Sequence, residues 1–184
     1  MSTVIIPERL ALLEALTIDK SSHKNFEEGH CALELVSWLS GEPWSDHPDC
    51  VSPVIGDFCR NWNDNLNGID RQQLKPYLVR LVGSKGNRAL ELRRSWMATN
   101  WLARECGPAF MDMTPALAEH AKALRALPEI TDKGSVNASL TVLAAAYDAT
   151  RAAAYDATWA ALASTVAHLQ ESAFALLDRM LEAV

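Results

Sequence analysis

The chain lacks the features that would place it in a membrane or in an oxidising compartment. Its 184 residues contain no run of 18 apolar residues, the minimum for a membrane-spanning helix, and no apolar signal region near the first residue. Together with these absences, four cysteines in 184 residues indicate a reduced intracellular protein. We therefore expect a cytoplasmic protein without a membrane contact.

The recognisable catalytic signatures are also missing. The sequence has no glycine-rich phosphate loop, no GxSxG elbow and no HExxH helix. It therefore carries none of the motifs by which the common nucleotide-binding proteins, serine hydrolases and zinc proteases are recognised. With 49% apolar residues, a chain of this length buries about 70% of its unfolded surface, so its core needs neither disulfides nor metal. The sequence predicts no catalytic residue, no cofactor and no metal site, and it favours a protein that is not an enzyme.

Charge is unevenly distributed along the chain. Residues 1–70 hold twelve acidic against four basic residues, a net charge of −8. Residues 71–109 hold two acidic against eight basic residues, a net charge of +6, and residues 110–184 carry −4. The basic segment either pairs with the acidic helices inside the fold or forms an anion-binding stripe with Arg88, Arg93 and Arg94. The total of −6 argues against a dedicated nucleic-acid binder.

Apolar spacing and caps predict helices along almost the whole chain, and hence an all-α multi-helix bundle. Asn25 and Glu28 have the spacing of a capping box, and Ser52-Pro53 has the form of an N-cap followed by proline at the first helical position. Pro76 predicts a kink or a fresh helix start. The predicted helices cover residues 7–17, 25–41 and 53–67, a stretch from Asp70 to Val82 that Pro76 interrupts, a helix from the turn at 83–86 to Gly107-Pro108, and residues 115–127.

The last third of the chain is rich in alanine, the strongest helix former. Sixteen of the 47 residues from 138 to 184 are alanine, and the block AAAYDATR (144–151) recurs as AAAYDATW (152–159). This composition predicts one long C-terminal helix, which divides the chain into a helical core domain (1–133) and the helix (134–184). The helix either packs within the bundle or forms a homo-oligomer seam. The seam residues would be Tyr155, Trp159, Leu162, Val166 and Leu169.

Two patterns suggest metal chemistry, and both are incomplete. His47 and Cys50 have the two-residue gap of a zinc-binding pair, yet tetrahedral zinc takes four ligands, and the adjacent His30 and Cys31 point about 100° apart on a helix. Glu27 and His30 have the Glu-x-x-His spacing of di-iron bundles, but the sequence contains no second copy. We therefore expect the cysteines to be buried and to bind no metal.

The segment at 41–52, which we name the proline-rich loop, is the most promising site. It contains two prolines among turn-forming residues, and loops are where function concentrates. Trp44 is either the plug of this loop or an exposed anchor for a partner. We predict that Trp44, Asp46, His47 and Asp49 contact a protein partner.

The runs GEPWSDHPDCVSPVIGDFCRNWND (41–64), LKPYLVRLVGS (74–84) and RRSWMATNWLARE (93–105) resemble a group of actinobacterial and phage-associated proteins that have no assigned activity. The resemblance covers most of the chain after residue 30. It implies an all-helical protein in a phage or mobile-element setting, and it transfers no catalytic residue.

Three functional hypotheses follow. The first is a non-catalytic cytoplasmic protein, such as a phage-encoded inhibitor or accessory factor, that binds a macromolecule through its acidic half and the proline-rich loop. The second is a metal-dependent enzyme or metalloprotein that uses His30, His47 and Cys50. The third is a binder of anionic ligands or nucleic acid through residues 71–104.

Overall fold

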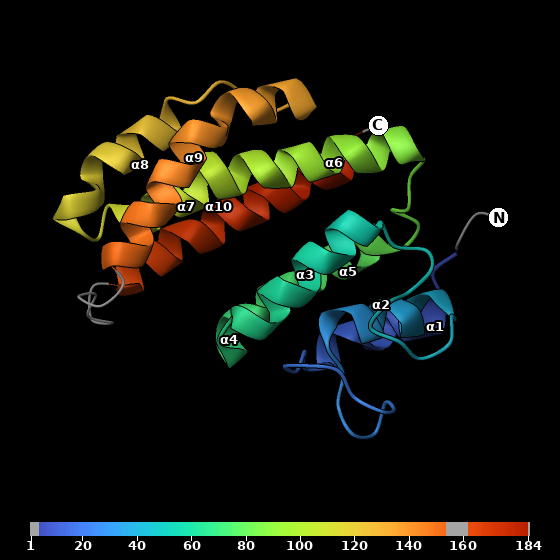
Figure 1. Ribbon diagram of the computed structural model, residues 1–184. Coiled ribbons are helices and arrows are strands. Elements are labelled where there is room, and N and C mark those ends of the chain that lie inside the picture. The colour runs from blue at the N-terminus through green and yellow to red at the C-terminus, as the bar shows by residue number, and fades with distance from the viewer. Residues whose placement is uncertain (1–3, 154–161, 184) are drawn as a thin grey trace. The chain divides into compact units, whose positions relative to one another are not determined.

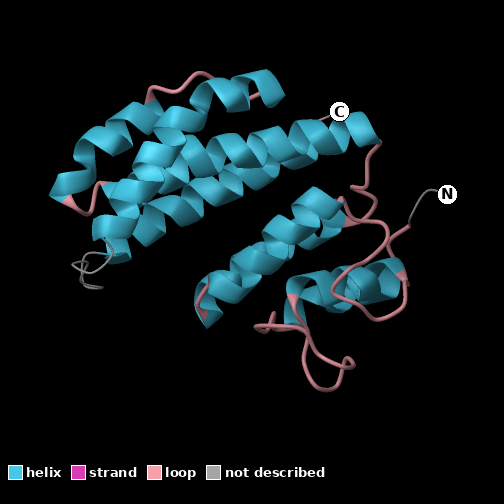
Figure 2. Cartoon of the chain, viewed as in Figure 1, coloured by secondary structure: helices cyan, strands magenta, loops and turns pink. Residues whose placement is uncertain are grey.

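The computed structural model describes residues 4–153 and 162–183, and its described residues are helices, turns and loops without a β-strand. The predicted all-α multi-helix fold with a long C-terminal helix is confirmed (Figures 1 and 2). The chain forms two compact units, Met1–Glu91 and Leu92–Val184. These units differ from the division expected at residue 133, because the helices that precede this residue pack with the alanine-rich segment. Within the described ranges, no helix is both long and apolar enough to span a membrane.

The first unit is built around α2, which packs against α3 and α5. Its core contains Leu33, Leu39, Ile55 and Leu78, all fully buried. The elements of this unit are α1 (Pro7–Leu12), η1 (Leu13–Ala15), α2 (Ala32–Ser40), α3 (Pro53–Asn65), α4 (Gly68–Arg71), η2 (Gln72–Leu74) and α5 (Lys75–Leu81). Helix α6 (Arg88–Trp101) begins in this unit and continues into the second.

The predicted cap of α3 and the predicted helix start at Pro76 are both confirmed. The Ser52 hydroxyl accepts a hydrogen bond from Ile55 N at 3.2 Å, and Pro53 occupies the first turn of α3. Pro76 starts a new helix, because proline in a first turn removes no intrahelical hydrogen bond.

Helix α2 begins at Ala32, and the prediction of a helix from Asn25 is wrong. The Asn25 side chain does accept from Glu28 N at 3.1 Å, but the turn ends there because Gly29 has φ +135°, which a helix cannot accommodate. Residues 19–30 therefore form an irregular segment, and Glu27 and His30 do not share a helical face.

In the second unit the helical path continues beyond the Gly107-Pro108 pair, where a stop was expected. The elements there are η3 (Leu102–Cys106), a π-helical turn, followed by α7 (Gly107–Met111), η4 (Pro115–Leu117), α8 (Ala118–Arg125), α9 (Lys133–Ala153) and α10 (Leu162–Glu182). Pro108 has no N–H to donate, so the helical hydrogen-bond pattern changes here. Gly107 N donates to Leu102 O, five residues back, instead of to a carbonyl four residues back.

Among the described residues, the alanine-rich segment contains two long helices, so the prediction that a single helix covers residues 134–184 is wrong. Helices α9 and α10 run in opposite directions within the second unit (Figure 1). Helix α9 packs against α8, and α10 packs against α7. The core under α8 and α9 contains Met111, Leu117, Ala121, Leu124, Leu127 and Ala146.

Candidate functional site

Trp44 closes the proline-rich loop from the inside. Its indole N–H donates to the carbonyl of His23 at 3.0 Å, and its ring meets Phe26 edge-on at 5.8 Å. Phe26 also contacts Trp38 at 5.1 Å, and the Arg9 guanidinium lies 5.5 Å above the Trp38 ring. Half-buried in this cluster, Trp44 is the plug of the loop, and its contact with a partner stays a prediction.

Glu42 holds the far end of the proline-rich loop. Its carboxylate accepts from the backbone N–H groups of Asp49 at 2.6 Å and Cys50 at 3.0 Å. The Ser37 hydroxyl on α2 donates to the carbonyl of Ser45 near the middle of the loop. These bonds fix the loop at several points along its length, so that its shape is set by the first unit itself.

Arg60 on α3 supports the central part of the loop. Its Nη1 donates to the carbonyl of Asp46 at 2.9 Å, and its Nη2 pairs with the carboxylate of Asp57. The Asp46 carboxylate pairs with Nδ1 of His47 at 2.7 Å, and the His47 side chain is 66% exposed. Asp49 is also exposed. The loop thus has an anchored inner side and a polar outer side.

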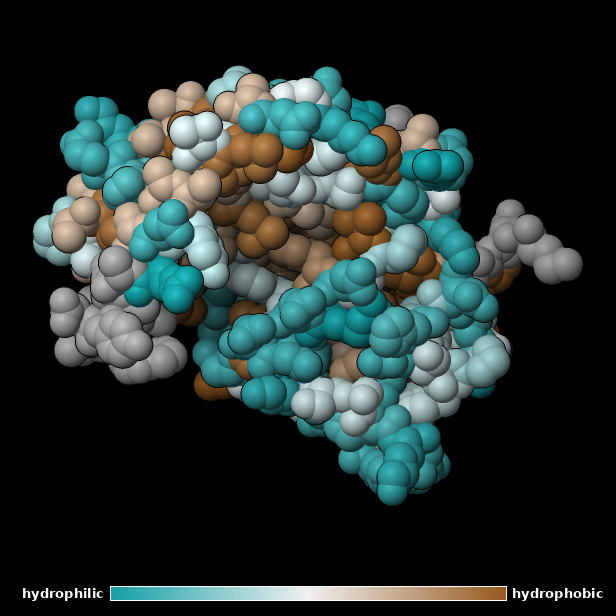
Figure 3. Space-filling model, viewed as in Figure 1, coloured by the Kyte–Doolittle hydropathy of each residue, from teal (hydrophilic) through white to brown (hydrophobic). Residues whose placement is uncertain are grey.

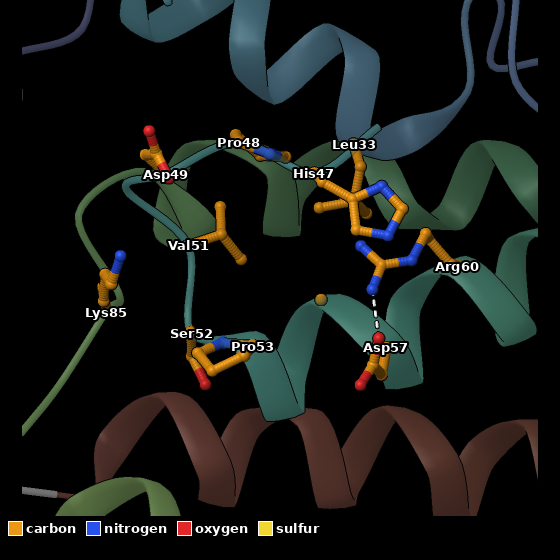
Figure 4. A pocket seen from close by; sticks show the side chains of 11 residues that line it. Leu33, His47, Pro48, Asp49, Val51, Ser52, Pro53, Asp57, Arg60 and Lys85 are labelled. Atoms are coloured by element: carbon orange, nitrogen blue, oxygen red, sulfur yellow. Dashed lines mark hydrogen bonds and ion pairs between the residues drawn. The ribbon is translucent and has the colours of Figure 1, made fainter. Parts of the chain in front are cut away.

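A hollow of about 250 Å³, which we name the loop hollow, lies between the proline-rich loop and the start of α3. Val51 and the Arg60 guanidinium lie on facing sides of it in Figure 4, and Asp49 lies at its rim. Its apolar walls are Leu33, Pro48, Val51 and Pro53, and its charged or titratable rim is His47, Asp49, Asp57, Arg60 and Lys85. Hydrophilic residues cover most of the first-unit face seen in Figure 3.

A buried carboxylate joins the irregular segment 19–30 to α2. Glu34 is 1% exposed, and it accepts from Cys31 N at 2.8 Å, from His23 Nδ1 at 3.0 Å and from His23 N. The Cys31 contact has the geometry of a capping box without a preferred residue at the N-cap. Because His23 also receives the Trp44 bond, Glu34 supports the base of the proline-rich loop.

The cysteines are not activated thiols. Burial raises the pKa of Cys31 and of Cys59 to about 12. Burial also raises the pKa of the Cys50 thiol, and the neighbouring Glu42 carboxylate raises it further. Burial alone raises the pKa of the Cys106 thiol. At neutral pH these groups are protonated, whereas a nucleophile or metal ligand has to be a thiolate.

The residues of the metal hypothesis have separate partners. His30 Nδ1 donates to the carbonyl of Thr17 at 2.7 Å, His47 pairs with Asp46, and Cys50 lies beside Glu42. Among the residues that the structure describes, no group of three or more His, Cys, Asp and Glu side chains is placed to hold a metal ion.

The predicted anion-binding arginines do not form one exposed stripe. Arg94 is 3% exposed, and its Nε donates to the carbonyl of Met180 at 2.9 Å. Arg88 and Arg93 are exposed. Arg71, in the same basic segment, is buried and donates to the carbonyls of Asn63 and Leu66. Part of the basic segment therefore serves the fold.

The predicted oligomer seam is only partly visible. Tyr155, Trp159 and the side chain of Leu162 lie outside the described residues. Val166 is half-buried and Leu169 is buried within α10. A seam between two copies stays a prediction.

Sequence reasoning missed Glu34 and Glu42, the two carboxylates that fix the site. Glu34 follows Cys31 by the three residues of a capping box, but cysteine gives no N-cap signal. The Glu42 carboxylate accepts hydrogen bonds from backbone N–H groups seven and eight residues later in the sequence, across a loop. No repeating sequence pattern predicts a contact at this separation. Neither role had a recognisable signal in the sequence.

Comparison with known proteins adds no relative to this picture. No family model, curated protein or solved structure matches the chain.

Proposed function

We propose that this chain is a non-catalytic binding protein that holds a protein partner against the proline-rich loop. The observation that carries the proposal is the contrast between the two sides of the loop. Its inner side is fixed by Ser37, Glu42, Trp44 and Arg60, while its outer side exposes His47 and Asp49 beside the loop hollow. A surface that is ordered in advance loses little entropy on binding, which favours affinity.

The lining of the loop hollow and the charge around it suggest the chemistry of the partner. The apolar walls suit one aliphatic or aromatic side chain, the kind of anchor that dominates binding energy at interfaces. The first unit, residues 1–91, holds thirteen acidic and nine basic residues, and its net charge of −4 attracts a basic surface and accelerates its association. We infer a partner that presents an apolar side chain flanked by lysine or arginine.

The protonated thiols support binding rather than covalent catalysis. Nucleophilic catalysis by cysteine uses a thiol whose pKa is lowered by a neighbouring base or cation. Here burial shifts the pKa of the described cysteines in the opposite direction. The geometry around them therefore favours a packing role.

Site-specific photo-crosslinking in native host cells tests the proposal. A photoreactive amino acid replaces the exposed Asp49, and a matched variant carries it at Ile69, which is 85% exposed in the same unit. We expect a discrete protein adduct at position 49 that is absent at position 69, and a lower yield of this adduct when a lysate of the cells is irradiated at higher salt. An absence of adducts at position 49, or the same adducts at both positions, would contradict the proposal.

A further inference from the structure

A second hollow, of about 520 Å³, lies within the second unit and is unrelated to the proline-rich loop. We name it the π-turn hollow, because two of its residues come from η3. It is lined by Arg104, Glu105, Ala109, Asp112, Arg125, Thr165 and His168, which belong to η3, α7 and its C-cap, α8 and α10. Its volume lies in the range of small-molecule sites, about 300–1,000 Å³.

Most of the charge around the π-turn hollow is already balanced. Arg125 forms a two-pronged pair with Asp112, and this contact lowers the pKa of the Asp112 carboxyl. Glu105 accepts from the Ser172 hydroxyl and lies 3.7 Å from the guanidinium of Arg179. Both carboxylates of the hollow therefore have cationic or hydroxyl partners within the unit.

Arg104 is the exception. Its Nε is buried and has no hydrogen-bond partner among the described residues. A guanidinium cannot lose its proton at physiological pH, so this donor keeps its positive charge and its need for an acceptor. A buried donor left unpaired is unusual in folded proteins, and the natural acceptors for arginine are carboxylate and phosphate oxygens.

The position of Arg104 follows from the sequence around Pro108. Because Pro108 cannot donate to Arg104 O, the backbone takes the wider π-helical turn from Leu102 to Cys106. Such turns insert a residue into a helix, and they occur often at functional sites. The turn thereby supplies Arg104 to the hollow that Thr165 and His168 line from α10.

We infer that the π-turn hollow binds a small molecule that carries a phosphate or carboxylate group. Arg104 is the main charged contact for this oxyanion, and Thr165 and His168 supply further hydrogen-bond donors. The volume leaves room for an apolar or polar body attached to the anionic group. This site and the proposed protein-binding loop lie in different units, so an experiment that contradicts one of the two proposals leaves the other unaffected.

Titration of the full-length protein, followed by amide and imidazole NMR signals, tests the inference. The probes are inorganic phosphate, adenosine monophosphate and succinate, each added at constant ionic strength. We expect saturable shifts at Thr165 and His168 for the phosphate probes, and shifts with succinate as well if the site accepts any oxyanion. Either pattern supports the inference and distinguishes phosphate from carboxylate. The absence of saturable shifts with all three probes would overturn it.

Two variants and one control assign the binding to this hollow. Because a charge-assisted hydrogen bond is lost, Arg104→Gln weakens binding by about tenfold or more. His168→Gln weakens it independently, should Arg104→Gln not fold. Lys133→Gln removes a positive charge from an exposed position at the start of α9, outside the hollow, and leaves binding unchanged. Equal losses in the control and the Arg104 variant would overturn the inference.

Discussion

Replacing Glu34 by glutamine removes the buried carboxylate that ties residues 19–30 to α2. The substitution keeps the size of the side chain and changes only its charge and its hydrogen-bonding groups. In the native protein both carboxylate oxygens accept, one from His23 N and the other from His23 Nδ1 and Cys31 N. Glutamine offers one acceptor oxygen. Its NH₂ group is a donor, so the N–H groups that face it lose their acceptor.

The size of the effect follows from these contacts. Glu34 is 1% exposed, so water cannot replace the lost acceptor. A buried backbone N–H left unpaired costs about 1–3 kcal/mol, and each charge-assisted bond contributes about 1.5–3 kcal/mol. Because glutamine keeps part of the bonding, we expect Glu34→Gln to lower the free energy of unfolding by about 2–4 kcal/mol.

Urea unfolding followed by tryptophan fluorescence measures this change, since Trp38 and Trp44 lie in the adjacent aromatic cluster. The matched control is Glu28→Gln, an exposed position in the same segment, for which a change within about 0.5 kcal/mol is expected. A loss below about 1 kcal/mol for Glu34→Gln would refute the role of this carboxylate.

Three further predictions concern other parts of the chain. Gly29→Ala strongly lowers the melting temperature, because the added methyl group would lie 2.7 Å from the His23 ring at a φ of +135°; a melting curve like that of wild type would contradict this clash. Cys31 and Cys59, with pKa values of about 12, react with a thiol reagent only after unfolding, and rapid labelling of either in native protein would show that their burial is wrong. The lowered pKa of Asp112 stabilises the protein above the pKa of the unfolded carboxyl, about 3.9, and this contribution is lost as the pH falls through the lower folded-state value. The difference in melting temperature between wild type and Asp112→Asn should therefore shrink below about pH 4, and a difference that stays constant from pH 7 to pH 3 would argue against the Arg125 pair.

Helix starts with a local signal could be predicted from the sequence. Ser52 and Pro53 carry the start of α3 within two residues, and Pro76 marks the start of α5. In each case the determining interaction lies within one turn of the helix, where capping preferences apply.

The start of α2 could not be predicted, because its determinants are distant. Asn25 and Glu28 imitate a capping box, and the local turn they form is real. The true N-cap is Cys31, whose partner Glu34 is held by His23, eleven residues earlier. A contact of this kind depends on the folded path of residues 19–30, which follows no periodic pattern.

The reversal between α9 and α10 was missed for a different reason. Residues 135–184 contain neither glycine nor proline, so nothing in the sequence marks the end of a helix. Alanine favours the helical state of each residue without limiting its length. The antiparallel arrangement comes from the packing of α9 against α8 and of α10 against α7. These contacts between helices cannot be predicted from amino-acid composition.

The position of the proline-rich loop could be predicted from the sequence, but the contacts that hold the loop could not. Two prolines and turn-forming residues mark the proline-rich loop correctly. The partners that fix it come from α2, α3 and the irregular segment, through Ser37, Arg60 and the carbonyl of His23. These pairs lie 8 to 21 residues apart, beyond the range of local rules.

The proposed function depends most directly on the loop being held in one conformation before any partner arrives. Amide hydrogen exchange of the free protein measures this at Asp49 and Cys50, whose N–H groups bind the Glu42 carboxylate. We expect both amides to exchange about tenfold or more slowly than in an unstructured peptide, and Glu42→Gln to accelerate them while Ile55, bound to Ser52, stays protected. Exchange of both amides at unstructured rates in the wild type would contradict a preformed binding surface.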